Sequence, residues 1–298
     1  MATTSGEWLT VMAEFFHSLL AQPFLQYALI AGLLASVGCG VIGAYVVVKR
    51  ITFIAGGIAH TVLGGMGAAV YYGFDPMAGA LLAAVAAALL IGSVRLYLRA
   101  QEDTLIGALW AIGMAVGILF ISRTPGYQSD LLSYLFGNIL LVPEKSLWFM
   151  AALDLILLGV VTARHREILV VIFDEEFARI RGVSVPFYYL LLLTLIAVTV
   201  VLLIQVVGLI LVLALITLPA ASAGHFLHSL TRMMLVATLL GAIETTTGLA
   251  LSYQTDAPAG PVIILLAGGV YLASALLQRL LGRYRNLRSL RRLEARHG

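Results

Sequence analysis

The sequence predicts an all-α polytopic membrane protein. Hydrophobic residues make up 61% of the 298 residues and charged residues only 11%, whereas about 25% of the residues of a soluble domain are charged. The hydrophobic residues also form runs of about 20, the length at which a helix crosses about 30 Å of hydrocarbon. A transmembrane β-barrel would show alternating segments of about ten residues instead. A net charge of +3 gives no reason to expect a nucleic-acid partner, and the expected surroundings are the lipid bilayer.

The chain reads as one membrane domain, residues 26–282, with a short segment on each side. Residues 1–25 lack a basic start and contain Glu7 and Glu14, so they do not resemble a signal peptide. We expect an interfacial amphipathic helix there, over 8–20. Residues 283–298 form a strongly basic tail. The single Cys39 lies within an apolar run, which excludes a disulfide framework and a cysteine metal cluster.

Turn residues and charges divide the membrane domain into spans. Residues 130–142 are apolar but too short to cross, which predicts a surface or re-entrant helix. Residues 187–226 supply either two spans joined near Gly208 or one long bent element. The other expected spans are 26–48, 52–73, 77–98, 104–122, 146–163, 233–253 and 261–281. The total is about nine transmembrane helices, or eight if 187–226 is not divided.

The distribution of Lys and Arg sets the orientation. If Lys49 and Arg50 are cytoplasmic and nine spans alternate, 16 of the 18 basic residues lie on the cytoplasmic side. Only Arg123 and Lys145 lie outside. We therefore expect the N-terminus outside and the C-terminus in the cytoplasm; with eight spans the basic tail would be forced outside.

Two ionisable residues are expected near the middle of the membrane, where such groups are costly and commonly functional. His60 lies about nine residues into its span among Gly56, Gly57, Gly64 and nearby small residues. Small residues let helices approach closely or leave space beside a side chain, and neutral imidazole is a good ligand for transition metals. Glu244 lies about twelve residues into its span. The two could form a transient cation site in a substrate pathway; alternatively, each hydrogen-bonds to a neighbouring helix.

Most of the other polar residues of interest lie at the ends of the spans, and Asp154 is the exception. Asp256 lies in a turn-rich segment at the outer side, where a carboxylate attracts cations, so we place it at an entrance. Asp130 is expected to cap a helix, and Asp154, in the middle of a span, has no assigned role. His225 and His228 share a helix face at the inner side, where a metal-exit role is the weaker alternative to ordinary interfacial histidines.

The mixed-charge segment 165–186 contains the clearest pointer to mechanism. Glu176, Ala178 and Gly182 fit a Glu-x-Ala-x-x-x-Gly pattern, which predicts a short helix ended by glycine. This pattern resembles the coupling helix with which ABC-transporter permeases dock on their ATPase subunits. The candidate ATPase-coupling residues are Asp174, Glu175, Glu176, Ala178, Arg179 and Gly182.

The chain contains no ATP-binding loop of its own. Such a loop needs Gly-x-x-x-x-Gly-Lys-[Ser/Thr], and the only lysines, Lys49 and Lys145, stand in other contexts. The sequence also lacks His-Glu-x-x-His and Gly-x-Ser-x-Gly. We therefore expect no enzyme and no permanently bound cofactor, with ATP and Mg²⁺ held by a partner chain.

Several short motifs occur in an order that is similar to one known family. The chain resembles the membrane permease subunit of bacterial zinc, manganese and iron ABC importers from about residue 20 to 282. The motifs are Pro23-Phe-Leu-Gln26, Lys49-Arg50-Ile51, Ile58-Ala-His60-Thr61, residues 132–137, 176–182, 213–222 and 248–252, and Pro258-Ala-Gly-Pro261.

The resemblance implies a set of partners, and this chain differs from the family motif at one position. It implies a homodimer in a bacterial or archaeal inner membrane, two cytoplasmic ATPase subunits, an extracytoplasmic metal-binding protein and a transported divalent metal. In the family an Asp commonly stands four residues before the His, where this chain has Gly56. A permease for a chelated metal, such as a siderophore or cobalamin-like compound, therefore remains an alternative. An ion-coupled secondary transporter is another, although an inverted repeat that would support it is not visible.

Overall fold

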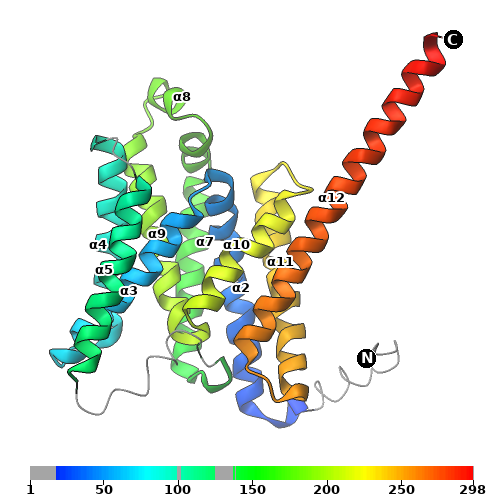
Figure 1. Cartoon of the computed structure of the whole chain (residues 1–298). Coiled ribbons are helices and arrows are strands. Elements are labelled where there is room, and N and C mark those ends of the chain that lie inside the picture. The colour runs from blue at the N-terminus through cyan, green and yellow to red at the C-terminus, as the bar shows by residue number, and fades with distance from the viewer. Residues whose placement is uncertain (1–17, 99–101, 125–136, 138, 298) are drawn as a thin grey trace.

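The computed structural model describes residues 18–98, 102–124, 137 and 139–297 and is predominantly helical there. Figure 1 shows a bundle of roughly parallel and antiparallel helices. Two short elements interrupt the pattern, a π-helix (η1) and a 3-10 helix (η2). The elements are α2 (Pro23–Lys49), α3 (Thr52–Tyr71), α4 (Pro76–Ser93), η1 (Val94–Leu98), α5 (Glu102–Ser122), η2 (Ile139–Leu141), α7 (Glu144–Phe173), α8 (Glu175–Ile180), α9 (Val185–Val207), α10 (Leu209–Gly224), α11 (Leu230–Thr255) and α12 (Ala259–His297).

The structure confirms the all-α polytopic class. Among the described residues, eight helices are long and apolar enough to cross a membrane, and α10 is a shorter apolar helix. The predicted division of 187–226 lies at Gly208, whose positive φ of 82° separates α9 from α10. Figure 1 shows the chain reversing there, so that α10 returns toward the end of the bundle where α9 began. With 16 residues, α10 is about 24 Å long and shorter than the eight candidate spans.

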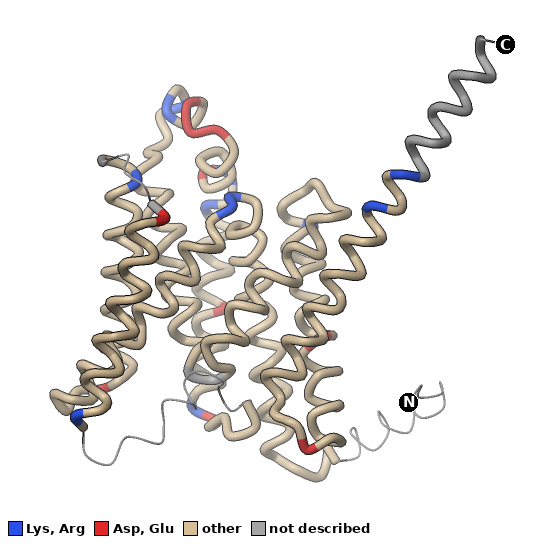
Figure 2. The backbone as a smooth tube through the Cα atoms, in the orientation of Figure 1, with Lys and Arg blue, Asp and Glu red and all other residues tan. Residues whose placement is uncertain are grey.

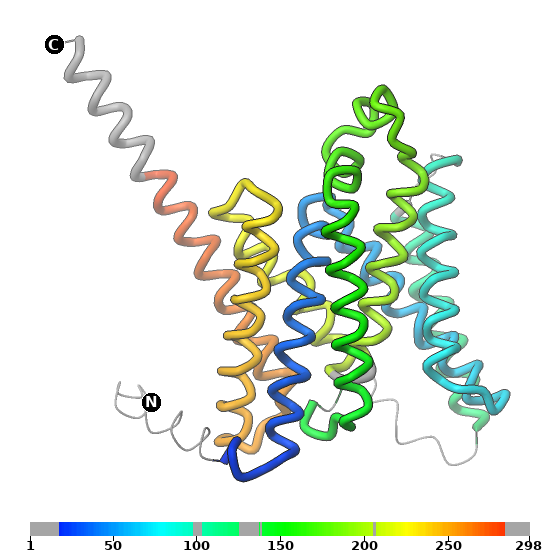
Figure 3. Tube along the Cα trace, turned by 180° about the vertical axis from the view of Figure 1, so that it is seen from behind, coloured from blue at the N-terminus to red at the C-terminus, as the bar shows by residue number. Residues whose placement is uncertain are grey.

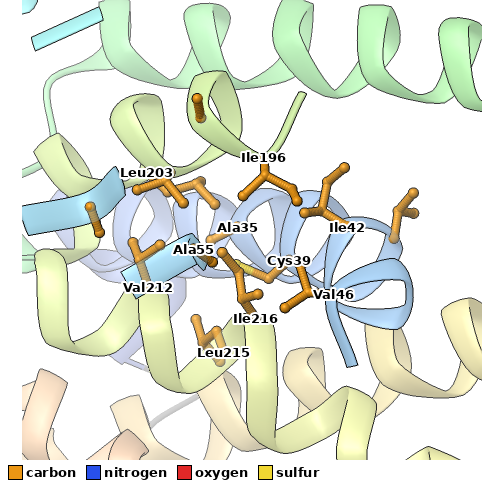
Figure 4. Packing of buried hydrophobic residues seen from close by; sticks show 14 of the residues in the cluster. Ala35, Cys39, Ile42, Val46, Ala55, Ile196, Leu203, Val212, Leu215 and Ile216 are labelled. Carbon is orange, nitrogen blue, oxygen red and sulfur yellow. The ribbon is translucent and has the colours of Figure 1, made fainter. Parts of the chain in front are cut away.

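Helix α2 is the centre of the packing. Figure 3 shows it between α11 and α7. Figure 4 shows Ala35, Cys39 and Ile42 of α2 packed among apolar side chains of α3, α9 and α10. The helices α3, α4 and α5 lie on one side of this centre, and α11 and α12 lie on the other (Figures 1 and 3).

Glycines on α2 allow this close packing. A Cβ at Gly43 would collide with the backbone carbonyl of Ile216 in α10, and one at Gly40 would lie 2.7 Å from the Cα of Thr238 in α11. We expect Gly43→Ala to lower the free energy of unfolding by about 1–3 kcal/mol, the usual cost of overpacking. Thermal unfolding in detergent measures this change. The matched control is Gly268→Ala in α12, where a Cβ meets open space; an equal loss in both variants would rule out the packing explanation.

The charges divide along the bundle as the alternation of nine spans predicts. Figure 2 shows Lys and Arg gathered at the end that carries α8 and on the coloured part of α12, with few at the opposite end. Lys49 ends α2 at the α8 end, and Arg50 closes the helix in the left-handed region with φ of 60°. The turn at the opposite end between α3 and α4 contains Asp75, which caps α4 by accepting from the backbone N–H groups of Met77 and Ala78.

Several boundaries differ from the expected ones. Helix α2 begins at Pro23, because proline suits the first helical turn. Helix α7 continues past the expected end at residue 163, through a kink at Arg164, to Phe173. Part of the polar segment 165–186 therefore extends a span, and α8 itself has only six residues. Helix α12 continues through the basic tail to His297. The expected helix over 8–20 lies outside the described residues except for 18–20, as does the 132–137 motif except for Gly137.

Candidate functional site

His60 occupies a tight position between α3 and α5. Its side chain is only 9% exposed, and its ring stacks on Trp110 with centroids 3.9 Å apart and an interplanar angle of 13°. The imidazole Nδ1 is buried without a hydrogen-bond partner. Stacking fixes the plane of the ring, so a free ring nitrogen is held in one orientation. The contact with Trp110 could not be predicted from the sequence, because it joins residues 50 positions apart.

The glycines around His60 serve close helix packing. A Cβ at Gly64 would lie 2.9 Å from the carbonyl oxygen of Gly113 in α5, and one at Gly67 would lie 2.7 Å from that of Gly117. This confirms the close approach that the small residues predicted. Beside the imidazole, a Cβ at Gly56 would reach only ordinary contact with Trp110, at 3.6 Å. Gly56, where the resemblance led us to expect Asp, is therefore adjacent to the His60–Trp110 stack.

Glu244 is the most deeply buried carboxylate that the structure describes in the bundle. It is 2% exposed, and neither carboxylate oxygen has a hydrogen-bond partner. The adjoining Thr245 does not serve it, because its hydroxyl donates to the carbonyl of Gly241 at 2.6 Å and lies 3.3 Å from Ser36 Oγ on α2. A carboxylate at this depth needs a proton or a cation. Among the described residues, no donor side chain therefore serves the carboxylate of Glu244.

Within one chain, His60 and Glu244 do not form a common site. Helices α3 and α11 lie on opposite sides of the central helices (Figures 1 and 3), and the oxygens of Glu244 accept no hydrogen bond from the imidazole. Among the described residues, no group of three or more His, Cys, Asp or Glu side chains is placed to hold a metal ion. A shared cation site at these two residues stays a prediction.

Asp256 lies at the end of the bundle opposite α8. It ends α11 in the left-handed region with φ of 50° and lines a cavity of about 690 Å³ together with Phe24, Ile139 and Tyr253. The exposed carboxylate thus faces a hollow between the start of α2, η2 and the α11–α12 turn. This placement fits the predicted entrance.

Asp154 is a second buried carboxylate, to which the sequence assigned no role. It is 6% exposed, and its Oδ2 has no partner. The Cα of Gly38 makes room for it, because a Cβ there would lie 3.0 Å from Asp154 Oδ1 and 3.5 Å from Thr199. A buried acidic residue is therefore present where α2, α7 and α9 meet.

The two histidines at the end of α10 have different environments. The Nδ1 of His225 lies 2.8 Å from the hydroxyl of Ser274 on α12, and its ring is tilted against that of Tyr271. His228 is exposed in the turn before α11. The packing of His225 against α12 favours the interfacial interpretation over a metal-exit role.

The predicted coupling helix exists as α8, and its residues divide into two groups. Asp174 caps it by accepting from the backbone N–H of Phe177 at 2.9 Å, and Glu175 accepts from Lys49 Nζ at 2.8 Å. Ala178 is fully buried. Gly182, with φ of 74°, ends the segment and donates its N–H to the carbonyl of Arg179.

The second group faces outward. Glu176 and Arg179 are exposed, as are the apolar side chains of Phe177 and Ile180, the latter 83% exposed. Both apolar side chains therefore lie on the same exposed helix as Glu176 and Arg179. Asp174 is exposed as well, whereas Glu175 is only partly exposed and turned toward Lys49, so the exposed face consists of predicted coupling residues together with Phe177 and Ile180.

These features define a multi-pass helical membrane protein with a short helix, α8, exposed at its basic end. The chain belongs to the ABC 3 transport family, whose model matches residues 21–278. It is 41% identical over 266 residues to the "Probable metal transport system membrane protein" of Chlamydia trachomatis, covering 87% of this chain and 91% of that protein. It is 33% identical over 257 residues to the manganese transport system membrane protein MntC of Halalkalibacterium halodurans, covering 86% and 88%.

A solved structure agrees in fold. The structure of PsaBC from Streptococcus pneumoniae in complex with Fab matches with a TM-score of 0.80 at 30% identity, covering 88% of this chain and 95% of that chain. The family that the motifs predicted is confirmed. The chain is accordingly an ABC-transporter membrane component and not an enzyme.

Proposed function

We propose that this chain is the permease subunit of an ATP-driven importer of divalent metal cations, with manganese, zinc and iron as the candidate ions. The observation that carries the proposal is α8, a capped and partly apolar helix exposed at the basic end of a family member. The names of the similar proteins, which are metal and manganese transport proteins, support a metal substrate.

The proposed mechanism is alternating access driven from outside the chain. Two ATPase subunits bind ATP, close, and move the α8 helices of a permease homodimer. A cation delivered by an extracytoplasmic binding protein enters at Asp256, passes the level of Glu244 and His60, and leaves between the two protomers. The basic end of the bundle is the cytoplasmic one, because short loops rich in Lys and Arg stay inside, and this puts the C-terminus in the cytoplasm.

Reconstitution tests the proposal. The chain, the ATPase that copurifies with it and the binding protein are placed in proteoliposomes, and uptake of Mn²⁺, Zn²⁺ and Fe²⁺ is measured with and without ATP. We expect uptake of at least one free ion only with ATP. Uptake of a ferric siderophore without any free ion would instead support a chelate permease. Uptake that needs an ion gradient and no ATPase would support a secondary transporter.

The docking role of α8 leads to a separate prediction. In Gly182→Trp a large side chain would occupy a left-handed position that favours glycine directly after the exposed face of α8. We expect this variant to lose the ATPase from a pull-down. The matched control is Gly73→Trp at the opposite end of the bundle, where φ is 75° and a Cβ also meets open space. The same backbone strain there should leave ATPase binding intact; retained binding in Gly182→Trp would count against docking at α8.

A further inference from the structure

One residue of α8 points back into the bundle. Lys49 Nζ donates to Glu175 Oε1 at 2.8 Å, and Arg95 Nη2 of η1 lies 3.6 Å from the same oxygen. Glu175 therefore connects α8 with the last residue of α2 and with the continuation of α4. Both ion pairs join segments far apart in the sequence, since Lys49 and Glu175 are separated by 126 positions.

Backbone carbonyls of α7, in addition to Glu175, hold the side chain of Lys49 in place. Its side chain is only 10% exposed, and Nζ also donates to the carbonyls of Val171 and Ile172 at 3.4 and 3.2 Å, at the end of α7. An exposed ion pair would contribute little. A largely buried ammonium has different consequences, because removal of its carboxylate leaves a charge that water cannot solvate well.

Arg95 extends the contact to α9. Its Nη1 donates to the hydroxyl of Tyr189 at 3.0 Å, and its guanidinium lies 4.8 Å from the centroid of the Tyr189 ring. Tyr189 is itself buried. The guanidinium is therefore fixed against the core and does not lie free on the surface.

Glu175 is ionised at neutral pH. Partial burial raises the pKa of its carboxyl, but the hydrogen bond from Lys49 and the charges of Lys49, Arg95 and Arg179 outweigh burial, so that the pKa is below its ordinary value. The ion pairs thus persist above that ordinary value and weaken only as the pH falls through the lowered one.

We propose that Glu175, Lys49 and Arg95 form a joint that passes movement of α8 to the transmembrane helices. Along the chain α8 is connected only to α7 and α9. The joint adds α2 and α4. Because Lys49 lies directly before the turn into α3, displacement of Glu175 also reaches the start of the helix that contains His60.

Helix α2, which ends at Lys49, also contacts the helix that contains Glu244. Helix α2 packs on α11 through Gly32 and Ser36, which lie against Thr245 and Gly241 on either side of Glu244 along the chain. A shift of α2 along its axis therefore changes the surroundings of Glu244. The three joint residues are positioning residues: they touch no substrate but link ATPase docking to both predicted pathway residues. This inference rests on the proposed function.

The test separates docking from coupling. Glu175→Gln keeps the size of the side chain and removes its charge. We expect wild-type amounts of ATPase to copurify with it and ATP hydrolysis to continue. Mn²⁺ taken up per ATP hydrolysed in proteoliposomes should fall about tenfold, within the range for residues that transmit coupling. Lys49→Met should have a similar effect. The double variant should lose less than the sum of the two single losses, because both remove the Lys49–Glu175 ion pair. Lys49→Arg, which keeps the positive charge, should keep most of the uptake.

Two controls and a second variant complete the experiment. Glu167→Gln removes a local ion pair with Arg164 and should leave uptake per ATP unchanged, whereas Glu176→Gln, on the exposed face, should reduce ATPase binding. Arg95→Gln replaces Glu175→Gln if the latter does not give a monodisperse protein. The coupling role of Glu175 is rejected if Glu175→Gln has wild-type uptake per ATP or if it loses the ATPase. Neither result contradicts the proposed function. A wild-type chain that binds no ATPase overturns the proposed function itself.

Discussion

Replacing His60 by alanine is expected to abolish ATP-dependent metal uptake. The imidazole is pinned by Trp110 with its Nδ1 buried and unpartnered, so the side chain is oriented before any ion arrives. Even partners that only orient metal ligands change affinity or activity by about 10- to 100-fold, and we expect loss of His60 itself to reach at least the upper figure. Mn²⁺ and Zn²⁺ uptake in proteoliposomes measures the effect.

Two further variants show whether uptake is lost because the His60 imidazole is missing or because the fold is disturbed. His228→Ala removes an exposed imidazole and should transport normally. Trp110→Phe keeps an aromatic ring beside His60 and should keep most of the uptake. In His60→Ala the ATPase should still copurify, since α8 lies at the basic end of the bundle (Figure 2). Normal uptake by His60→Ala would remove His60 from the pathway.

The span map could be predicted from the sequence because each span is an uninterrupted apolar run between charged or turn residues. Gly208 is an informative position: it is a glycine in the middle of a largely apolar stretch of 40 residues, 187–226, and its positive φ is what divides the stretch into two helices. The kink at Arg164 and the extension of α7 to Phe173 could not be predicted in this way. Residues 164–167 are polar, and polarity shows where the membrane ends, not where a helix ends.

The candidate site was less predictable than the fold. The depth of His60 and Glu244 follows from counting residues within a run. Their partners depend on which helices meet, and the meeting of α3 with α5 is decided by facing glycines such as Gly64 and Gly113. Glu175 shows the same limit, because the sequence places it in a coupling segment but cannot reveal that Lys49, 126 residues earlier, turns it inward.

Glu244→Gln is expected to reduce uptake as strongly as loss of His60, and it separates the two interpretations of this residue. Glutamine has nearly the size of a protonated glutamic acid and keeps hydrogen-bonding capacity. If Glu244 were a permanently protonated residue bonded to a neighbouring helix, the variant would fold and transport like the wild type. The structure shows no such bond, since both carboxylate oxygens are buried without a partner.

A buried carboxylate without a hydrogen-bond partner is suited to bind a cation briefly during transport. An unpaired charge at membrane depth is costly, and an arriving divalent cation removes that cost while it stays, which gives binding that is transient. Glutamine cannot supply the charge, so uptake should fall while thermal stability in detergent stays the same or rises. The control is Thr246→Val two residues along α11, because its hydroxyl donates to its own helix at Ala242, 2.7 Å away, and its loss should leave uptake unchanged. Full uptake by Glu244→Gln would exclude Glu244 as a charged step in the pathway.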